Sequence, residues 1–263
     1  MTDSPGMAER PLLVYQSSIG DQKPITLRTQ GHASACPFCD HSQLPAILRQ
    51  DGDILLVPNK YPVLQGSDPY VLIETSLCDT ELSLYADEHL LRVFQMAFDL
   101  WRDMLANPAY RSVLFMKNHG PFSGGSLRHP HMQLIGLYHV DAQVHISKAD
   151  FLGPVIQKEP GVELTISDRP RVGYAEFNVI LKDEDAFPAF CRLIQKTVRY
   201  VLQHYHEGHV DSYNLFFYAL DGLTYCKVMP RLATTPIYIG YTISQVTDNL
   251  SSIVEDFRQQ NPL

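Results

Sequence analysis

The order of secondary-structure patterns in this sequence runs twice along the chain. Short apolar runs typical of strands are followed by one long amphipathic helix and then by further strands, first within residues 12–138 and again within residues 162–229. A length of 263 residues fits either two packed domains or one duplicated fold. The repetition therefore predicts an α+β fold of two tandem units, residues 1–150 and residues 151–263.

The individual elements follow from the spacing of the apolar residues. Strands are predicted at residues 12–16, 53–58, 70–74, 112–116, 132–138, 162–167, 176–181, 212–219 and 224–229. Helices with apolar residues spaced by three and four are predicted at residues 87–105, 187–205 and 243–258. We expect these helices to pack on the strands and to bury the core.

Charge and cysteine content narrow the possible functions. A formal net charge of −8 argues against a nucleic-acid-binding protein, because backbone binding needs a clustered basic surface. No stretch approaches the roughly 20 apolar residues that span a bilayer, and residues 1–10 are polar, so we expect a cytoplasmic protein. Five cysteines, an odd number, indicate metal binding or buried free thiols and not a disulfide framework.

The segment 117–133 combines the features that phosphate chemistry requires. Gly124 and Gly125 let the backbone approach a ligand closely, so that consecutive N–H groups can point at phosphate oxygens. Further neutral donors in the segment are Asn118, Ser123 and Ser126. The segment therefore predicts a loop that binds a phosphorylated ligand.

The same segment ends in His129-Pro130-His131-Met132-Gln133, whose alternate residues share one face of a strand. A neutral imidazole is a good nucleophile towards phosphorus, because its ordinary pKa of about 6.5 leaves it largely deprotonated at physiological pH. A His-x-His pair can also be incidental or a metal site. The glycine loop, the donors and the histidines lie in one short segment, which favours phosphoryl chemistry with His131 as the nucleophile.

These residues resemble the histidine-triad superfamily, and within it the transferase branch typified by galactose-1-phosphate uridylyltransferase. The resemblance is carried by Asn118, the loop 123–126 and the His-Pro-His-x-Gln motif, and it extends from Cys36 to Tyr241. It is closest to a group of small bacterial members of that branch. The resemblance implies two histidine-triad-like units, each an antiparallel sheet with a packed helix.

The resemblance also implies a catalytic role for three residues. His131 would take the nucleotidyl group, Gln133 would hydrogen-bond a non-bridging phosphoryl oxygen, and Ser126 would contact the phosphates together with Asn118. Gln133 stands where the hydrolases of the superfamily have a third histidine. Glutamine cannot act as an acid, so it favours a covalent nucleotidyl-enzyme that persists until a phosphate acceptor arrives.

Cys36 and Cys39 have the two-residue spacing that lets two thiolates bind one tetrahedral zinc ion. The resemblance completes the site with Cys78 and His129, which gives a Cys₃His set that would fix the strand carrying His131. We therefore predict a structural zinc site. The alternative is that the cysteines are reduced and buried without a metal. Two other residues are candidates for the fourth ligand: His89 and His119.

The resemblance implies further contacts with substrate. Asn59 and Tyr61 match the segment that holds base and ribose, with Lys60 where the best-known members have an acidic residue. Arg28 is predicted to meet a phosphate or the base, although a solvated charge is the alternative. Residues predicted to bind the sugar phosphate in the second half are Lys227, Arg231 and Tyr241. Thr242 replaces a glutamate that contacts hexose hydroxyls in the galactose enzymes, which disfavours galactose.

Three functions remain open on these observations. The leading hypothesis is a nucleotidyltransferase of carbohydrate metabolism that moves a nucleoside monophosphate from a nucleotide sugar to a sugar phosphate through nucleotidyl-His131. The second is a phosphorylase or hydrolase of nucleoside diphosphate sugars or dinucleoside polyphosphates. The third is a non-catalytic nucleotide-binding protein on the same fold. We also expect a homodimer, because relatives of this fold commonly pair.

Overall fold

Twelve strands and five α-helices are present in the computed structural model, which describes residues 11–25, 27 and 36–262. The first five strands are β1 (Arg49–Asp51), β2 (Ile54–Pro58), β3 (Ser67–Ile73), β4 (Ser112–His119) and β5 (His131–Leu137). The others are β6 (Val155–Glu159), β7 (Val162–Ile166), β8 (Gly173–Tyr174), β9 (Phe177–Leu181), β10 (Tyr213–Leu220), β11 (Leu223–Pro230) and β12 (Gln245–Val246). The helices are α1 (Ser17–Gly20), α2 (Asp87–Ala106), α3 (Phe187–Gln203), α4 (Pro236–Tyr241) and α5 (Leu250–Gln260).

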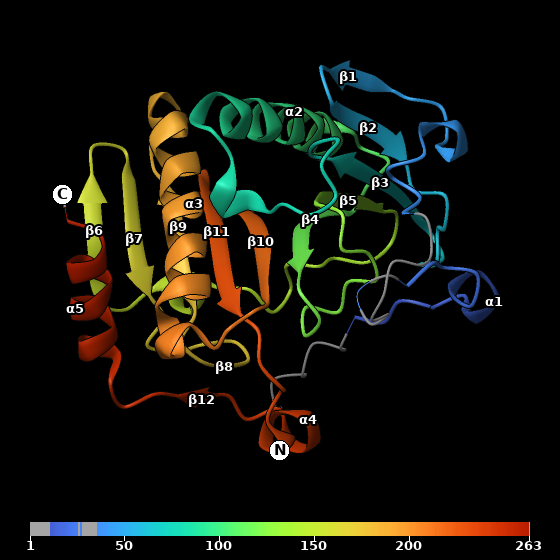
Figure 1. Cartoon of the computed structure of the whole chain (residues 1–263). Helices are drawn as coiled ribbons and strands as arrows, with labels where there is room; N and C mark the ends of the chain where they lie inside the picture. Colours follow the sequence, from blue (N-terminus) through green and yellow to red (C-terminus); the bar gives the residue numbers. More distant parts are fainter. Residues whose placement is uncertain (1–10, 26, 28–35, 263) are drawn as a thin grey trace, which may run out of the picture.

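Ten of these strands form one sheet in the order β1-β2-β3-β5-β4-β10-β11-β9-β7-β6 (Figure 1). From its edge to the middle of the sheet, the first half has the order β1-β2-β3-β5-β4, and the second half has the equivalent order β6-β7-β9-β11-β10. In each half the long helix, α2 or α3, precedes the innermost strand, β4 or β10, along the chain. All neighbouring strands in this sheet are antiparallel. The predicted duplication of an α+β unit with an antiparallel sheet and a packed helix is confirmed.

The halves are joined where β4 pairs with β10, from Phe115 opposite Phe217 to His119 opposite Tyr213. The rings of Phe115 and Phe217 stack with centroids 4.0 Å apart. Aromatic contact on this scale adds stabilisation beyond the burial of area. The pairing therefore makes one continuous hydrophobic core out of two sequence repeats.

The helices α2 and α3 form where the apolar residues recur at three and four. Acidic residues Asp87 and Glu88 occupy the first turn of α2, where the positive end of the helix dipole favours them. Phe94, Phe98 and Trp101 of α2 are buried against the sheet. α3 lies beside it, and α5 lies along β6 at the opposite edge from β1 (Figure 1).

Two of the predicted elements differ from the structure. The strand predicted at residues 12–16 is reduced to one bridge between Tyr15 and Leu64, and its apolar side chains stay largely exposed. The helix predicted at 243–258 begins only at Leu250, after the short α4 and β12. No helix within the described part of the chain is long and apolar enough to cross a membrane.

In the first half, no long helix of the described residues covers the sheet face opposite α2. Strand alternation directs Leu55 and Val57 of β2 and Val71 and Ile73 of β3 to this face, where Phe38 and neighbouring Leu44 pack on them. The chain between β4 and β5 passes over the same face. This open face carries the candidate site.

Candidate active site and metal centre

The pairing of the strands places the predicted catalytic residues side by side on the open face. His131 of β5 lies opposite Ile73 of β3, and Gln133 lies opposite Val71. Lys117 of β4 pairs with Met132, so the next residue, Asn118, comes beside His131. The side chains of His131, Gln133 and Asn118 therefore converge on one region of the sheet.

This region is the floor of a cavity of about 440 Å³. Among the predicted site residues, the cavity is lined by Asn59, Tyr61, Asn118, Gly124, Gly125, Ser126, His131 and Gln133. Its wall also contains an apolar part that includes Phe38, Leu44, Val57 and Val71. Residues separated by more than 70 positions in sequence thus meet in one concave site with polar and apolar parts.

The ring of His131 is held at a fixed orientation in the floor of the cavity. Its Nδ1 lies 2.8 Å from the backbone oxygen of His129, and because a carbonyl only accepts, Nδ1 carries the proton. The lone pair is therefore on Nε2. Burial lowers the pKa of His131 to about 4, so the ring is neutral near pH 7. The edge contact with Phe38, at 5.3 Å between centroids, fixes the ring further.

The loop between β4 and β5 is shaped by glycines and by the second half of the chain. Gly120 and Gly124 both have φ of +83°, which L side chains rarely adopt. The hydroxyl of Ser123 donates to Gly120 O and accepts from Gly125 N. The side-chain amide of Asn214 donates to Asn118 Oδ1 and to Ser123 O, at 2.6 and 3.0 Å. Ser123 therefore supports the loop instead of lining the cavity.

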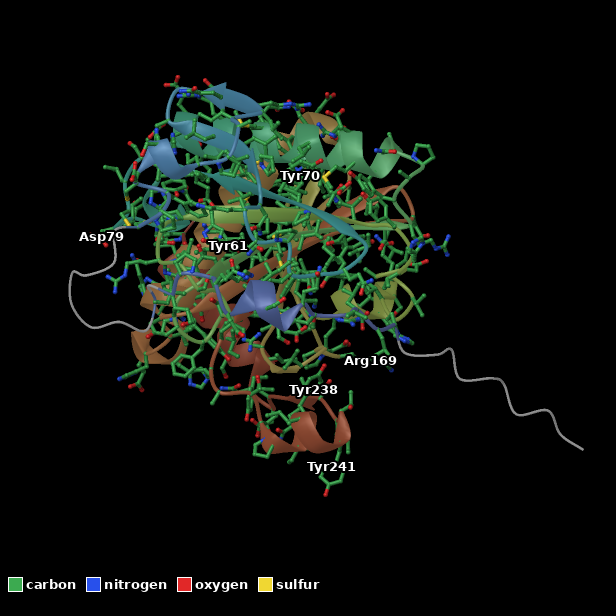
Figure 2. All side chains as sticks on the ribbon, turned by 90° about the vertical axis from the view of Figure 1, so that its right-hand side faces the viewer. Tyr61, Tyr70, Asp79, Arg169, Tyr238 and Tyr241 are labelled. Carbon is green, nitrogen blue, oxygen red and sulfur yellow. The ribbon has the colours of Figure 1, made fainter. Side chains whose placement is uncertain are left out.

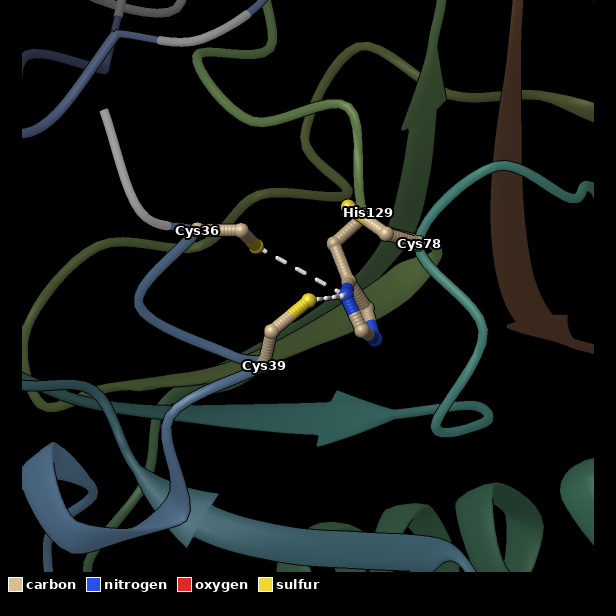
Figure 3. Close-up of side chains that lie close together, drawn as sticks. All are labelled: Cys36, Cys39, Cys78 and His129. Carbon is tan, nitrogen blue, oxygen red and sulfur yellow. Dashed lines mark hydrogen bonds between the residues drawn. The ribbon is translucent and has the colours of Figure 1, made fainter. Parts of the chain in front are cut away.

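Four side chains next to the cavity form a cluster that could hold a metal ion (Figure 3): Cys36, Cys39, Cys78 and His129. Their ligand atoms all lie within 4.8 Å of one another. Sγ of Cys36 and of Cys39 lie 3.6 and 3.5 Å from Nδ1 of His129. Around a tetrahedral ion with bonds of about 2.0–2.3 Å, neighbouring nitrogen and sulfur ligands are about 3.6 Å apart. The four residues therefore fit a tetrahedral metal.

The protonation state of the cluster also fits a metal. Nε2 of His129 donates to Thr75 O at 2.7 Å, which leaves Nδ1 free as a ligand. Burial raises the pKa of Cys36, but the His129 ring and two backbone N–H groups outweigh it, and the pKa falls to about 7. Burial and the neighbouring Cys36 raise the pKa of Cys78 to about 12. A bound cation would stabilise the cysteines as thiolates, which otherwise repel one another.

The two reserve ligands lie outside the cluster. The ring of His89 stands beside Tyr85 and 4.0 Å from Asp53, and His119 stacks on Tyr213. Cys78 takes the third cysteine position, as the resemblance implied.

Beneath the site, on the helix side of the sheet, lies a buried ion pair that the sequence analysis missed. Lys117 is 1% exposed and Glu74 is fully buried, and the ammonium contacts the carboxylate. The other carboxylate oxygen accepts from the hydroxyl of Tyr85 at 2.8 Å. Glu74 N also donates to Pro130 O, so the pair connects the ends of β3 and β4 to the histidine motif.

Comparison with known proteins identifies the family. A model of the N-terminal domain of a family described as a domain of unknown function, DUF4931, matches residues 15–140, and its C-terminal domain model matches residues 143–261. This chain belongs to the DUF4931 family. A crystal structure of a DUF4931 protein from Bacillus cereus is 39% identical with a TM-score of 0.76, and the match covers 83% of this chain and 100% of that one. Comparison of the sequence with curated proteins gave no match.

Two enzymes of low sequence identity have a similar fold. An ADP-glucose phosphorylase from Arabidopsis thaliana with bound ADP-glucose has a TM-score of 0.72 at 14% identity, covering 90% of this chain and 93% of that one. A uridylyltransferase has a TM-score of 0.69 at 13% identity, covering 94% and 98%. These likenesses show that the chain shares the fold of the two enzymes.

Not all predicted site residues of the DUF4931 protein reach the cavity. Lys227 is fully buried, and its ammonium contacts Glu176, Asn178 and two further oxygens, so no donor remains for a substrate phosphate. This position corrects its assignment as a phosphate ligand. Arg231 instead donates to Asn214 Oδ1 at 2.9 Å and so supports the loop indirectly. Arg28 lies outside the described residues.

Tyr241 is on α4, which projects from the sheet, and the side chain is 77% exposed (Figure 2). It does not line the cavity of its own chain. Its role in substrate binding and the homodimer both stay predictions, and light scattering tests the second.

Several residues that line the cavity escaped the sequence analysis, among them Lys23, Phe38 and Leu44. Phe38 lies inside the Cys-x-x-Cys turn, and that position was the only signal that could have indicated it. Lys23 and Leu44 carried no local signal, because they reach the cavity through the path of the loops.

Proposed function

We propose that this DUF4931 protein transfers nucleoside monophosphate groups between phosphate oxygens through a covalent nucleotidyl-His131 intermediate. The observation that carries the proposal is the His131 ring in the cavity floor, with Nδ1–H bonded to a backbone oxygen and Nε2 left as the nucleophilic nitrogen. A nucleotide sugar is the proposed donor and a sugar phosphate the proposed acceptor.

In the first half-reaction, His131 Nε2 attacks the α-phosphorus of the donor. The P–N bond forms while the P–O bond to the departing sugar phosphate breaks. The positive charge of the substituted imidazole is stabilised by the bond from Nδ1–H to His129 O. In the second half-reaction a phosphate oxygen of the acceptor attacks, the P–O bond forms, and the P–N bond breaks to regenerate neutral His131.

The neighbouring groups act on the phosphate oxygens. The side-chain amides of Gln133 and Asn118 and the hydroxyl of Ser126 line the same cavity and are suitable donors to non-bridging oxygens. The backbone N–H of Gly124 adds a further neutral donor, whereas that of Gly125 already donates to the hydroxyl of Ser123. The side-chain amide of Gln133 is neither an acid nor a base, so it cannot take the proton of an attacking water; water is therefore a poor acceptor and the intermediate persists.

We further propose that the Cys₃His cluster binds zinc and that the ion is structural. Thiolates with one imidazole form a preferred donor set for zinc. When bound, zinc would supply a fixed tetrahedral anchor for His129, two residues before the nucleophile. Elemental analysis tests this: we expect about one zinc per chain in the unmodified protein and in Cys191→Ala, a buried cysteine outside the cluster, and clearly less in Cys36→Ser and Cys78→Ser.

The covalent step is tested by intact mass measured without acid after incubation with nucleoside diphosphate sugars and dinucleoside polyphosphates. We expect an adduct of one nucleoside monophosphate that is absent in His131→Ala and retained in His139→Ala, an exposed histidine two residues after β5. Absence of an adduct with every donor would contradict the enzyme and favour the non-catalytic nucleotide-binding protein.

A second candidate activity shares the first half-reaction. The likeness of fold to an ADP-glucose phosphorylase favours inorganic phosphate as an alternative acceptor. Adding sugar phosphates, inorganic phosphate or water alone to the isolated adduct distinguishes transferase, phosphorylase and hydrolase by which of them discharges it.

A further inference from the structure

The charges that line the cavity are unlike those of the protein as a whole. The chain has a formal net charge of −8, yet no Asp or Glu lines the cavity within the described residues. Two lysines do so, Lys23 and Lys60. A cavity that excludes carboxylates and contains two ammonium groups is electrostatically suited to an anion.

Lys60 lies at the end of the cavity that is remote from the nucleophile. It follows Asn59, whose N–H donates to Pro69 O at 2.8 Å, and Pro69 pairs with Ile135 of β5. Ile135 is four residues beyond His131, or about 13 Å along the strand, and β2 is two strand spacings from β5, or about 10 Å. The backbone at Lys60 is therefore roughly 16 Å from that at His131.

Lys23 approaches the cavity from the N-terminal segment. That segment is tied to the loop after Lys60, because Gln16 N donates to Val63 O at 2.8 Å and its side-chain amide to Pro62 O at 3.3 Å. Lys23 is half-buried, and burial lowers its pKa. Neither Lys23 nor Lys60 has a side-chain hydrogen bond or ion pair with any other described residue. An anionic ligand stabilises such an ammonium group more than it would stabilise one that is already in an ion pair.

The remaining surfaces orient a nucleotide in the cavity. The α-phosphate belongs at His131, and the apolar wall that contains Leu44 and Val57 suits the flat face of a base. The ribose then faces the end of β2. A carboxylate at such a position accepts hydrogen bonds from free ribose hydroxyls, whereas a cation accommodates a phosphate on the ribose.

We propose that the nucleotide recognised by this site carries a second phosphate on its ribose, at the 2′ or 3′ oxygen, and that Lys23 and Lys60 bind it. The inference rests on the proposed function, since it uses the same cavity and the same position for the α-phosphate. It narrows the donor to ribose-phosphorylated nucleotides.

Isothermal titration calorimetry with isomeric nucleotides tests the proposal. The probes are 5′-AMP, adenosine 3′,5′-bisphosphate, adenosine 2′,5′-bisphosphate and 5′-ADP, with the uridine counterparts. The bisphosphates and 5′-ADP have the same number of phosphates, so their comparison separates a phosphate on the ribose from additional charge alone. The variants are Lys23→Ala and Lys60→Ala, and the matched control is Lys158→Ala, an exposed lysine of β6 at the far edge of the sheet.

One of the two ribose bisphosphates should bind about tenfold or more tightly than both 5′-AMP and 5′-ADP, as expected for charge-assisted hydrogen bonds. Lys23→Ala and Lys60→Ala should remove most of that gain without weakening 5′-ADP, while Lys158→Ala changes neither. Binding of 5′-AMP with no gain from a ribose phosphate would overturn this inference and leave the proposed function standing. Failure of every nucleotide to bind would overturn both.

Discussion

Replacing Lys117 by methionine should destabilise the protein strongly, because it leaves a charged group without its partner inside the core. Lys117 is 1% exposed and Glu74 is 0% exposed, and the two form an ion pair below the histidine motif. Methionine retains most of the length and apolar stem of lysine, so packing is largely preserved. The change therefore isolates the loss of the charge.

The expected magnitude follows from the surroundings of Glu74. Removing one partner of a buried ion pair costs about 3–5 kcal/mol. The hydroxyl of Tyr85 still donates to the carboxylate at 2.8 Å, so we expect the lower end, about 3 kcal/mol. In the double variant Lys117→Met, Glu74→Gln the buried charge is gone, and stability should recover by about 2 kcal/mol.

Urea unfolding measures this effect, and Trp101, the single tryptophan, is 2% exposed in the core and reports it. With a denaturant slope of about 2–3 kcal/mol/M, Lys117→Met should lower the midpoint by about 1–1.5 M. The control is Arg49→Met, from an exposed pair with Asp103 that should contribute less than about 1 kcal/mol. A midpoint for Lys117→Met equal to that of the control would refute the reasoning.

Further predictions concern the loop and the residue beside the nucleophile. Gln133→His supplies a group that can take the proton of an attacking water and should shorten the lifetime of the isolated nucleotidyl adduct in water; an unchanged lifetime by intact mass contradicts the role of Gln133. Gly124→Ala should cost about 1–2 kcal/mol, because φ is +83° although the space around it is open. Gly120→Ala should cost clearly more, because its Cβ would also lie 2.3 Å from the backbone oxygen of Asp211. Thermal unfolding ranks the two glycine variants, and equal midpoints would contradict the steric argument.

The sequence by itself determined the features that depend on neighbours along the chain. The three and four spacing of apolar residues located α2 to within one residue at its end, and the repetition of patterns indicated two α+β units. The Cys-x-x-Cys turn and the alternation of His129, His131 and Gln133 are likewise local. The relative positions of these side chains depend only on the local geometry of a turn and a strand, so the sequence alone predicts them.

Only the tertiary structure decided which distant residues meet and in what environment they lie. Lys23 and Phe38 join the cavity through loop paths that no sequence period encodes. Lys227 and Lys117 look alike as basic residues in apolar strands, yet both are buried and paired with carboxylates that lie more than 40 positions away in sequence. Whether a charge is solvated, paired or open to a ligand depends on long-range packing. The fold was therefore needed to distinguish Lys60, which lines the cavity, from Lys227, which is buried in an ion pair.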